Sequence, residues 1–342
     1  MLNLNGQIEK MKETIVYIFR NSNPKYKSIE GVFHNLSKLI GLHLDTSVIE
    51  LKYAGGSVRN MWFNLTSFKR KDDEIYHITG DVQYMGIVTG KRSVLTVHDV
   101  QSIVKGSFLK KLYMKLFWFW LPAMFVKRIT VISEFTRTEL ENILPFFQYK
   151  IRTVYNPVNE VFKYTDYQFN QNKPRILLLG TKPNKNLERT FESLKGIHCE
   201  LTIIGQLTEH QLQLIETLEL DVTEAYNLSL KEVVAQYQSC DLLCFASTYE
   251  GFGMPIIEAQ AMGRPVLTSN LGAMKEVSKD TAYLVDPYDI SSIRTGIETL
   301  LADADLRQAL IQKGLQNVTR FSAEAIAKNY MAIYRELTTE TT

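Results

Sequence analysis

The sequence predicts an α/β fold made of two doubly wound, mostly parallel sheets. Short runs rich in Val, Ile and Leu alternate with longer helical patterns along the 342 residues, which is typical of consecutive βαβ units. This length is sufficient for two domains that each have a core of their own. A polar stretch at 164–174 separates two such series. We therefore expect a first domain at 1–163, a linker at 164–174 and a second domain from 175.

The expected elements follow from these patterns in chain order. In the first domain we expect strands at 14–20, 47–53, 74–78, 93–97, 128–132 and 151–154. In the second domain we expect strands at 175–179, 200–204, 221–225, 242–245, 265–268 and 282–285. Helices are expected at 186–195, 209–218, 230–237, 255–262, 290–301, 305–320 and 323–337. Ser229 and Glu232 have the spacing of a capping box, which predicts the start of one helix.

The composition is that of an ordinary globular protein, with 45% hydrophobic and 22% charged residues. The three cysteines, Cys199, Cys240 and Cys244, are too few and too irregularly spaced for a disulfide framework or a zinc site. They indicate buried thiols in a reducing compartment. No signal peptide is visible near the first residues, so we expect a cytoplasmic protein.

The charge is unevenly distributed along the chain. Residues 1–170 contain 23 Lys and Arg against 15 Asp and Glu, whereas residues 171–342 contain 16 against 22. A basic first half indicates contact with an anionic surface. Because no nucleic-acid motif is present, we expect no nucleic acid partner. An anionic membrane or an acceptor that carries pyrophosphate is the preferred interpretation.

The most distinctive motif contains two carboxylates that are separated by seven residues. Its glycines let the backbone approach a ligand closely, and its proline suits the first turn of a helix. The N-terminus of that helix would favour a phosphate, and both carboxylates could accept hydrogen bonds from sugar hydroxyls beside it. The alternative is a turn before a core helix, with both carboxylates solvated. The run is Glu250-Gly251-Phe252-Gly253-Met254-Pro255-Ile256-Ile257-Glu258.

This run resembles the Glu-x7-Glu motif of the retaining glycosyltransferases of family 4, also described as glycosyl transferases group 1. The resemblance continues through residues 259–266 and through Glu276-Val277. It implies the GT-B architecture, in which two Rossmann-like domains face each other across a cleft. It also implies that the second domain ends at 322 and that the last segment, 323–342, crosses back onto the first domain as a helix.

The resemblance further implies transfer of a sugar from a nucleotide-diphosphate sugar to a hydroxyl acceptor, with retention of the anomeric configuration. Glu250 would contact the donor sugar, and Glu258 would contact the ribose hydroxyls. The backbone amides of Gly251, Phe252, Gly253 and Met254 would approach the sugar and its phosphate. No metal or other cofactor is expected.

A second segment is expected to hold the diphosphate. Gly180 follows a predicted strand, and Lys182 and Lys185 precede a predicted helix, a pattern that suits a phosphate cradle. The alternative is an ordinary surface loop. Lys185 matches the lysine with which the family grips the donor diphosphate. Thr181 and Asn184 stand where many family members have a second cation, so Lys182 is the expected replacement.

Three residues of the first domain are further candidates. His98 ends a predicted strand and titrates near neutral pH, and the resemblance implies that it faces the transferred sugar; a His-Asp pair at a strand end can also be structural. Asp81 ends another strand and is a candidate for the acceptor side. Gly31 matches one glycine of the pair that the family places over the donor phosphates, with Glu30 in place of the other.

The segment 116–126 is apolar, contains two tryptophans and is flanked by lysines. It is too short to span a bilayer, so it is either an interfacial helix or a buried helix of the first domain. The string Asp303-Ala304-Asp305 resembles a metal-binding motif of another glycosyltransferase fold. We expect it to be a helix start, with Asp305 as the N-cap.

Together these patterns and the family resemblance predict a glycosyltransferase, which the resemblance implies is retaining, of bacterial surface-polysaccharide or lipopolysaccharide assembly. It would act on a saccharide or lipid-linked saccharide acceptor at the inner face of the membrane. The alternatives are a nucleotide-sugar epimerase or phosphorylase of the same fold, and a non-catalytic partner subunit that kept the GT-B fold.

Overall fold

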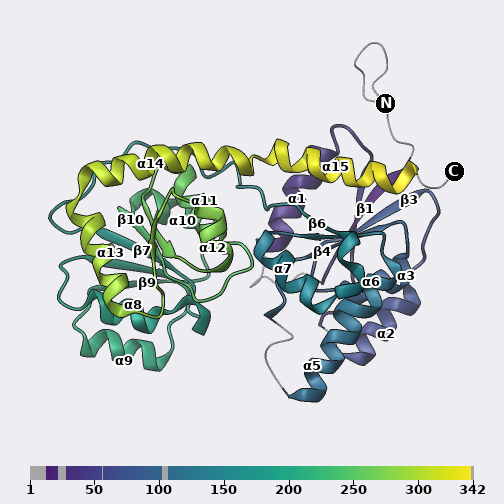
Figure 1. Ribbon diagram of the computed structural model, residues 1–342, viewed down its shortest axis with the longest axis horizontal. Coiled ribbons are helices and arrows are strands. Elements are labelled where there is room, and N and C mark those ends of the chain that lie inside the picture. Colours follow the sequence, from purple (N-terminus) through teal and green to yellow (C-terminus); the bar gives the residue numbers. More distant parts are fainter. Residues whose placement is uncertain (1–12, 22–27, 56, 102–106, 340–342) are drawn as a thin grey trace, which may run out of the picture. The chain divides into compact units, whose positions relative to one another are not determined.

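The computed structural model describes residues 13–21, 28–55, 57–101 and 107–339 (Figure 1). The chain forms two compact units. The first unit contains Met1–Pro157 together with Ala323–Thr342, and the second contains Val158–Ser322. The last helix therefore belongs to the first unit, although 165 residues of the second unit precede it in the chain.

The first unit contains a six-stranded parallel sheet in the order β2-β1-β3-β4-β5-β6. Its strands are β1 (Thr14–Phe19), β2 (Thr46–Glu50), β3 (Glu74–Ile78), β4 (Ser93–Val97), β5 (Arg128–Val131) and β6 (Ile151–Thr153). Its helices are α1 (Ser28–Ile40), α2 (Val58–Ser67), η1 (Gln83–Met85), α3 (Gly86–Thr89), α5 (Phe108–Met114), the π-helical turn η2 (Lys115–Trp120), α6 (Leu121–Phe125), α7 (Glu134–Ile143), η3 (Pro145–Lys150) and α15 (Ala323–Thr339).

The two faces of this sheet have separate cores, because successive side chains of a strand point to opposite faces. Val16 and Ile18 of β1 pack in a core with α6, whereas Tyr17 packs in a core with α1 and α15. In this second core, His77 of β3 forms two buried hydrogen bonds. Its Nδ1 lies 2.6 Å from the hydroxyl of Tyr334 in α15, and its Nε2 lies 2.7 Å from a threonine hydroxyl of β4. These contacts attach the last helix to the sheet.

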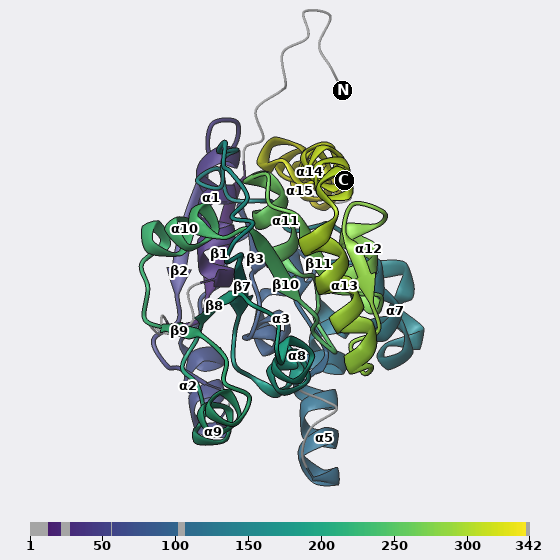
Figure 2. The same ribbon diagram turned by 90° about the vertical axis from the view of Figure 1, so that its left-hand side faces the viewer.

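The second unit contains another six-stranded parallel sheet, in the order β12-β11-β10-β7-β8-β9, with helices on both faces (Figure 2). Its strands are β7 (Arg175–Leu179), β8 (Glu200–Ile204), β9 (Val222–Ala225), β10 (Leu242–Phe245), β11 (Val266–Ser269) and β12 (Tyr283–Val285). Its helices are η4 (Pro183–Lys185), α8 (Leu187–Leu194), α9 (Glu209–Thr217), α10 (Leu230–Ser239), α11 (Met254–Ala261), α12 (Gly272–Ser278), α13 (Ile290–Ala302), α14 (Ala304–Val318) and η5 (Thr319–Phe321).

The expected strands and helices are all present. Every expected helix ends within two residues of its predicted bounds, and every strand within one residue except β2, which ends at Glu50 and not at 53. The capping box of α10 is confirmed, because Ser229 and Glu232 each accept from the other's backbone amide. The expected N-cap Asp305 is wrong: Asp303 caps α14 by accepting from the amide of Leu306 at 2.8 Å, and Asp305 lies in the first turn.

The polar stretch 164–174 packs on the second unit. The buried guanidinium of Arg264 stacks on the ring of Tyr167, with 3.9 Å between the guanidinium carbon and the ring centre. Arg264 also donates to the backbone carbonyl and the hydroxyl of Thr165 and to the carbonyls of Tyr237, Gln238 and Met262. The stretch is polar because it supplies partners to buried polar groups of the domain.

We expect Arg264→Ala to lower the free energy of unfolding of the second unit by about 3 kcal/mol, because several buried carbonyls lose their donor. Urea unfolding followed by circular dichroism measures this change. The matched control is Lys231→Ala, which removes an exposed cation from the start of α10. A loss no larger than that of the control would contradict this role of Arg264.

Candidate functional site

Each sheet has one place where the strand order reverses direction, and open α/β sheets bind ligands at the carboxyl ends of the strands at that place. In the second unit it lies between β7 and β10. The loops that follow these two strands are joined by hydrogen bonds. The carbonyl of Asn184 accepts from the amide of Thr248 at 2.8 Å, and the Asn184 side-chain amide donates to the carbonyl of Tyr249 at 3.0 Å.

An ion pair lies at this junction. Nζ of Lys185 is 2.7 Å from Oε1 of Glu250, and their side chains are only 18% and 16% exposed. The same Glu250 oxygen accepts from the side-chain amide of Asn184 at 3.2 Å. Nζ of Lys185 also lies 4.7 Å from the centre of the Phe245 ring, within the range of a cation–π interaction. The structure thus brings together the lysine and the glutamate that the two sequence motifs had singled out separately.

Gly180 makes room for this lysine. Its φ is +82°, and a Cβ at this position would lie 2.8 Å from Cε of Lys185. Any other residue would have to displace the lysine side chain. Lys182 is exposed and precedes the short turn η4, so it lies in the same loop as Lys185.

Asn186 holds the far end of this loop. Its φ is +60°, a conformation that asparagine tolerates better than most residues. Its buried side-chain amide donates to the carbonyls of Ala246 at 3.0 Å and Pro287 at 2.6 Å. Asn186 therefore gives the loop after β7 its shape and attaches it to the loop after β10.

The glycine-rich run leads directly into α11. Gly253 has a φ of +107° and stands at the N-cap position, and Met254 is the first helical residue. Gly251 is partly exposed, whereas the side chain of Phe252 is buried and packs edge-to-face on Phe321, with ring centres 5.5 Å apart. The Phe252 side chain therefore belongs to the core, and its backbone amide remains the group predicted to meet a ligand.

Glu258 lies in the second turn of α11 and is held by a residue that sequence reasoning missed. The hydroxyl of Tyr237, at the end of α10, donates to Oε2 of Glu258 at 2.7 Å. Burial raises the pKa of Glu258 to about 7, against the opposing effects of this hydrogen bond and of the charge on Lys185. Burial also raises the pKa of Tyr237, so its hydroxyl stays protonated and acts as the donor.

In the first unit the strand order reverses between β1 and β3, and His98 follows the neighbouring strand β4. Nε2 of His98 donates to the carbonyl of Thr79 at 2.6 Å. Burial lowers the pKa of His98, although this hydrogen bond and nearby carboxylates act in the opposite direction. Gly80 has a φ of +133°, and a Cβ there would lie 2.5 Å from Cδ2 of His98. Gly80 is a second residue that the sequence analysis did not assign to the site.

Arg20, directly after β1, was also missed. Its Nε lies 2.5 Å and its Nη2 3.3 Å from the two carboxylate oxygens of Glu30, and its Nη1 contacts Asp81. The predicted Gly31 follows Glu30 in the first turn of α1 and has open space where a Cβ would stand. The position at which the resemblance implies a second glycine thus carries a carboxylate that is paired with an arginine.

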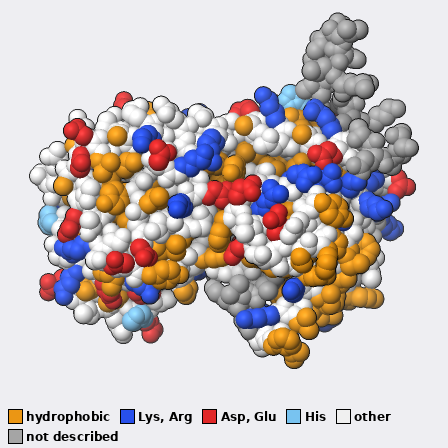
Figure 3. Space-filling view, viewed as in Figure 1, with side chains coloured by type: hydrophobic (Ala, Val, Ile, Leu, Met, Phe, Trp, Pro, Cys, Tyr) orange, Lys and Arg blue, Asp and Glu red, His pale blue; other side chains and the backbone are white. Residues whose placement is uncertain are grey.

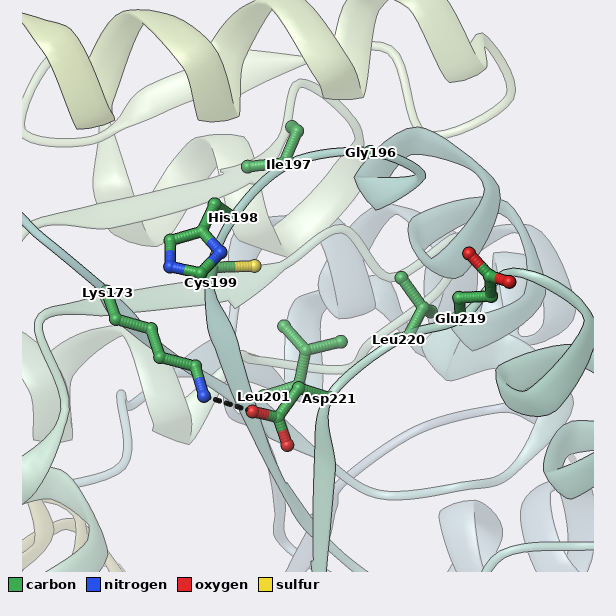
Figure 4. A pocket seen from close by; sticks show the side chains of 9 residues that line it. All are labelled: Lys173, Gly196, Ile197, His198, Cys199, Leu201, Glu219, Leu220 and Asp221. Atoms are coloured by element: carbon green, nitrogen blue, oxygen red, sulfur yellow. Dashed lines mark hydrogen bonds and ion pairs between the residues drawn. The ribbon is translucent and has the colours of Figure 1, made fainter.

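A separate cavity of about 280 Å³ lies at the amino ends of β8 and β9 (Figure 4). Lys173 and Asp221 form an ion pair in its wall. None of the predicted site residues lines it. Among the residues that the structure describes, no group of three His, Cys, Asp or Glu side chains is arranged to hold a metal ion.

Comparisons with known proteins agree with this geometry. Residues 164–317, which contain the Lys185–Glu250 pair and α11, match the family model described as glycosyl transferases group 1. This part of the chain is similar to the group 1 glycosyltransferases. The remaining residues of the chain lie outside the matched range.

Two relatives act in the synthesis of bacterial surface polysaccharides according to their names. The chain is 28% identical over 223 residues to the O-antigen chain mannosyltransferase RfbU of Salmonella typhimurium, an alignment that covers 61% of each protein. It is 32% identical over 148 residues to the capsular polysaccharide biosynthesis glycosyltransferase CapM of Staphylococcus aureus, covering 41% of this chain and 38% of that protein. Both alignments span less than two thirds of the relative's length.

Solved structures show the same fold over nearly the whole chain. Sucrose-phosphate synthase from Thermosynechococcus elongatus has a TM-score of 0.78 at 17% identity, covering 96% of this chain and all of that one. Anabaena HepE, solved with UDP and glucose, has a TM-score of 0.79 at 14% identity, covering 95% of this chain and all of that one. The predicted GT-B fold with two Rossmann-like domains is confirmed.

The raised pKa of Glu258 predicts a pH-dependent effect on stability. The folded protein binds the Glu258 proton more tightly than the unfolded chain does. The stability of the fold therefore falls as pH rises from 4.5, the ordinary pKa of a glutamate, through about 7. We expect Glu258→Gln to raise the free energy of unfolding at pH 8 by on the order of 2 kcal/mol, and by much less at pH 5. Thermal denaturation at both pH values measures the difference. An equal stabilisation by Glu258→Gln at pH 5 and pH 8 would contradict the raised pKa of Glu258.

Proposed function

We propose that the protein is a retaining glycosyltransferase that moves a sugar from a nucleotide-diphosphate sugar to a hydroxyl of a saccharide or lipid-linked saccharide acceptor. The observation that carries this proposal is the Lys185–Glu250 pair at the reversal of strand order in the second unit. It combines a cation for the diphosphate with a carboxylate for sugar hydroxyls, and it lies within the stretch that matches the family model.

In this proposal the diphosphate of the donor binds beside Lys185 and the N-terminus of α11. The ammonium group has three protons, so it can keep its hydrogen bond to Glu250 and still donate to a phosphate oxygen. The amides of Gly251, Phe252, Gly253 and Met254 and the exposed Lys182 are the further groups for the sugar and its diphosphate. Positive charge placed in advance near the leaving diphosphate stabilises the charge that develops there, without a metal ion.

Glu258 is assigned to the ribose. Tyr237 occupies its Oε2, which leaves Oε1 as the acceptor for ribose hydroxyls. With a pKa of about 7, the carboxyl is close to half ionised at neutral pH. Hydrogen bonds from ribose hydroxyls favour the ionised form, so donor binding would draw Glu258 towards the carboxylate.

The first unit is assigned to the acceptor. His98 is kept neutral by burial, and the half-exposed carboxylate of Asp81 follows the adjacent strand. Asp81 can accept from an acceptor hydroxyl. In a front-face displacement, the acceptor oxygen bonds to the anomeric carbon while the bond to the diphosphate breaks on the same face. The acceptor proton passes to the leaving phosphate oxygen, and the anomeric configuration is retained.

We place this reaction in the cytoplasm, at the inner face of the membrane, in the assembly of a bacterial surface polysaccharide. The names of the Salmonella and Staphylococcus relatives support this setting. The basic first half of the chain supports it as well, because lipid-linked acceptors carry a pyrophosphate at an anionic membrane.

The first experiment is a thermal shift of the purified protein with UDP, GDP, ADP and CMP, each without metal. A ligand present at a hundred times its dissociation constant adds about 2.7 kcal/mol of stability. The nucleotide that shifts the melting temperature then selects the panel of donor sugars for transfer assays.

We expect Lys185→Ala and Glu250→Gln each to lower kcat/KM of transfer by about a hundredfold or more, because each removes a group that meets the donor in the transition state. Glu298→Gln, on the exposed surface of α13, is the matched control and should retain activity. Unchanged kinetics in the folded Lys185 and Glu250 variants would refute the assignment. Interconversion of the free nucleotide sugar, with no transfer to an acceptor, would identify an epimerase instead.

A further inference from the structure

Helix α5 of the first unit is apolar, yet the structure buries none of its seven residues. Phe108 is 78% exposed, Leu109 76% and Leu112 53%, and Leu116 in the following turn is 43% exposed. Figure 1 shows α5 at the lower end of the first unit, and Figure 3 shows hydrophobic side chains gathered in this region. Exposed apolar patches of this kind on a globular protein mark an interaction surface.

The exposed side chains share one side of the helix. Phe108, Leu112 and Leu116 are spaced by four residues, which aligns them along the helix axis. Met124 and Phe125 at the end of α6 are 55% and 40% exposed. Next to this end, Phe146 and Tyr149 of η3 are also exposed. We call this set of exposed side chains the apolar face: Phe108, Leu109, Leu112, Leu116, Met124, Phe125, Phe146 and Tyr149.

The elements that carry the apolar face are attached to the core of the first unit on their other side. Trp118 and Phe119 of the π-helical turn are buried in the core. The buried ammonium of Lys150 caps the end of α6, since it donates to the carbonyls of Ala123 at 2.7 Å and Val126 at 2.8 Å. The Tyr113 hydroxyl reaches the sulfur of a methionine in α2 at 2.9 Å. The backbone that carries the outward side chains is thus attached to the core, although none of the described residues of the unit covers these side chains.

The segment that contains α5, η2 and α6 carries charges of one sign. Between Asp99 and Glu134 the sequence contains six Lys and Arg residues and no Asp or Glu. Lys110 and Lys115 are exposed beside the apolar side chains, and Nζ of Lys115 lies 6.0 Å from the centre of the Trp120 ring. A helix that presents apolar side chains together with exposed lysines is complementary to an anionic lipid surface, in which the apolar side chains enter the acyl region and the ammonium groups meet the headgroups.

We propose that the apolar face docks the first unit on the surface of an anionic lipid bilayer. The contact is with one leaflet: within the described part of the chain, no helix has the length and hydropathy to cross a membrane. This inference extends the proposed function, because it would hold the acceptor-binding unit where a lipid-linked acceptor is embedded. The docking itself can be tested independently of any transfer activity.

The test is co-sedimentation of the full chain with vesicles of phosphatidylcholine alone and of phosphatidylcholine mixed with phosphatidylglycerol. We expect binding to the anionic vesicles that weakens with salt. Leu109→Ser combined with Leu112→Ser should lower the partition coefficient at least about tenfold, because two leucines no longer enter the acyl region. Lys110→Ala and Lys115→Ala should each lower it about fivefold on anionic vesicles only.

The matched control is Leu42→Ser, which removes a leucine of 75% exposure that lies after α1, outside the apolar face. It should leave vesicle binding unchanged. No binding to anionic vesicles, or an equal loss in the Leu42 variant, would overturn the proposal. A dimer in solution that the Leu109 and Leu112 substitutions dissociate, without vesicle binding, would show that a second copy of the chain covers the face.

Thermal shift with nucleoside diphosphates separates this inference from the proposed function. The double leucine variant, the two lysine variants and the control should all keep the shift of the unmodified protein, because the substituted residues lie outside the nucleotide site. Vesicle binding without a nucleotide shift in the unmodified protein would sustain the docking surface and count against the transferase. A nucleotide shift without vesicle binding would support the transferase and count against the docking surface.

Discussion

The site in the second unit depends on one ion pair. Lys185 and Glu250 come from loops that follow different strands, and their charged groups meet at 2.7 Å in a largely buried position. Two opposite charges removed from water stabilise each other only when the geometry is good, so the loops have to be held accurately. Gly180 supplies the space for the lysine, and the side chains of Asn184 and Asn186 join the two loops. The glycine-rich run then leads from this pair directly into α11.

In the first unit, different residues surround the place where the strand order reverses. Its positive charge at the end of β1, Arg20, is paired with the carboxylates of Glu30 and Asp81. Beside them His98 packs against Gly80 and donates to the carbonyl of Thr79. The unit is basic as a whole, yet this edge of its sheet is rich in carboxylates, which suits the hydroxyls of a saccharide better than a phosphate. Lys110 and Lys115 lie instead beside the apolar face. The groups that suit a saccharide and those that suit an anionic surface therefore lie in different parts of the unit.

The sequence predicted the elements well because parallel strands that are buried on both faces leave continuous apolar runs. It also predicted Gly180, Lys185, Glu250 and Glu258, which stand in two short motifs. Tyr237, Arg20 and Gly80 were missed for a common reason. Each acts through a partner that is distant in the chain, such as Tyr237 on Glu258, 21 residues later, so no local pattern reveals it.

Likewise, the polar stretch 164–174 has the composition of a linker, and only its contacts with the buried Arg264 show that it packs on a domain.

By itself, the sequence determined the α/β class, the positions of strands and helices and the two series of βαβ units, and it predicted a chemistry for the glycine-rich run. These features depend on periodicity and on residues within one or two turns of each other, which physical chemistry relates directly to local structure. The tertiary structure alone decided the strand orders, the raised pKa of Glu258 and the exposure of α5, whereas the return of α15 to the first unit had been implied only by the family resemblance. These properties arise from burial and from contacts between residues that are far apart in the chain, and burial is a property of the whole fold.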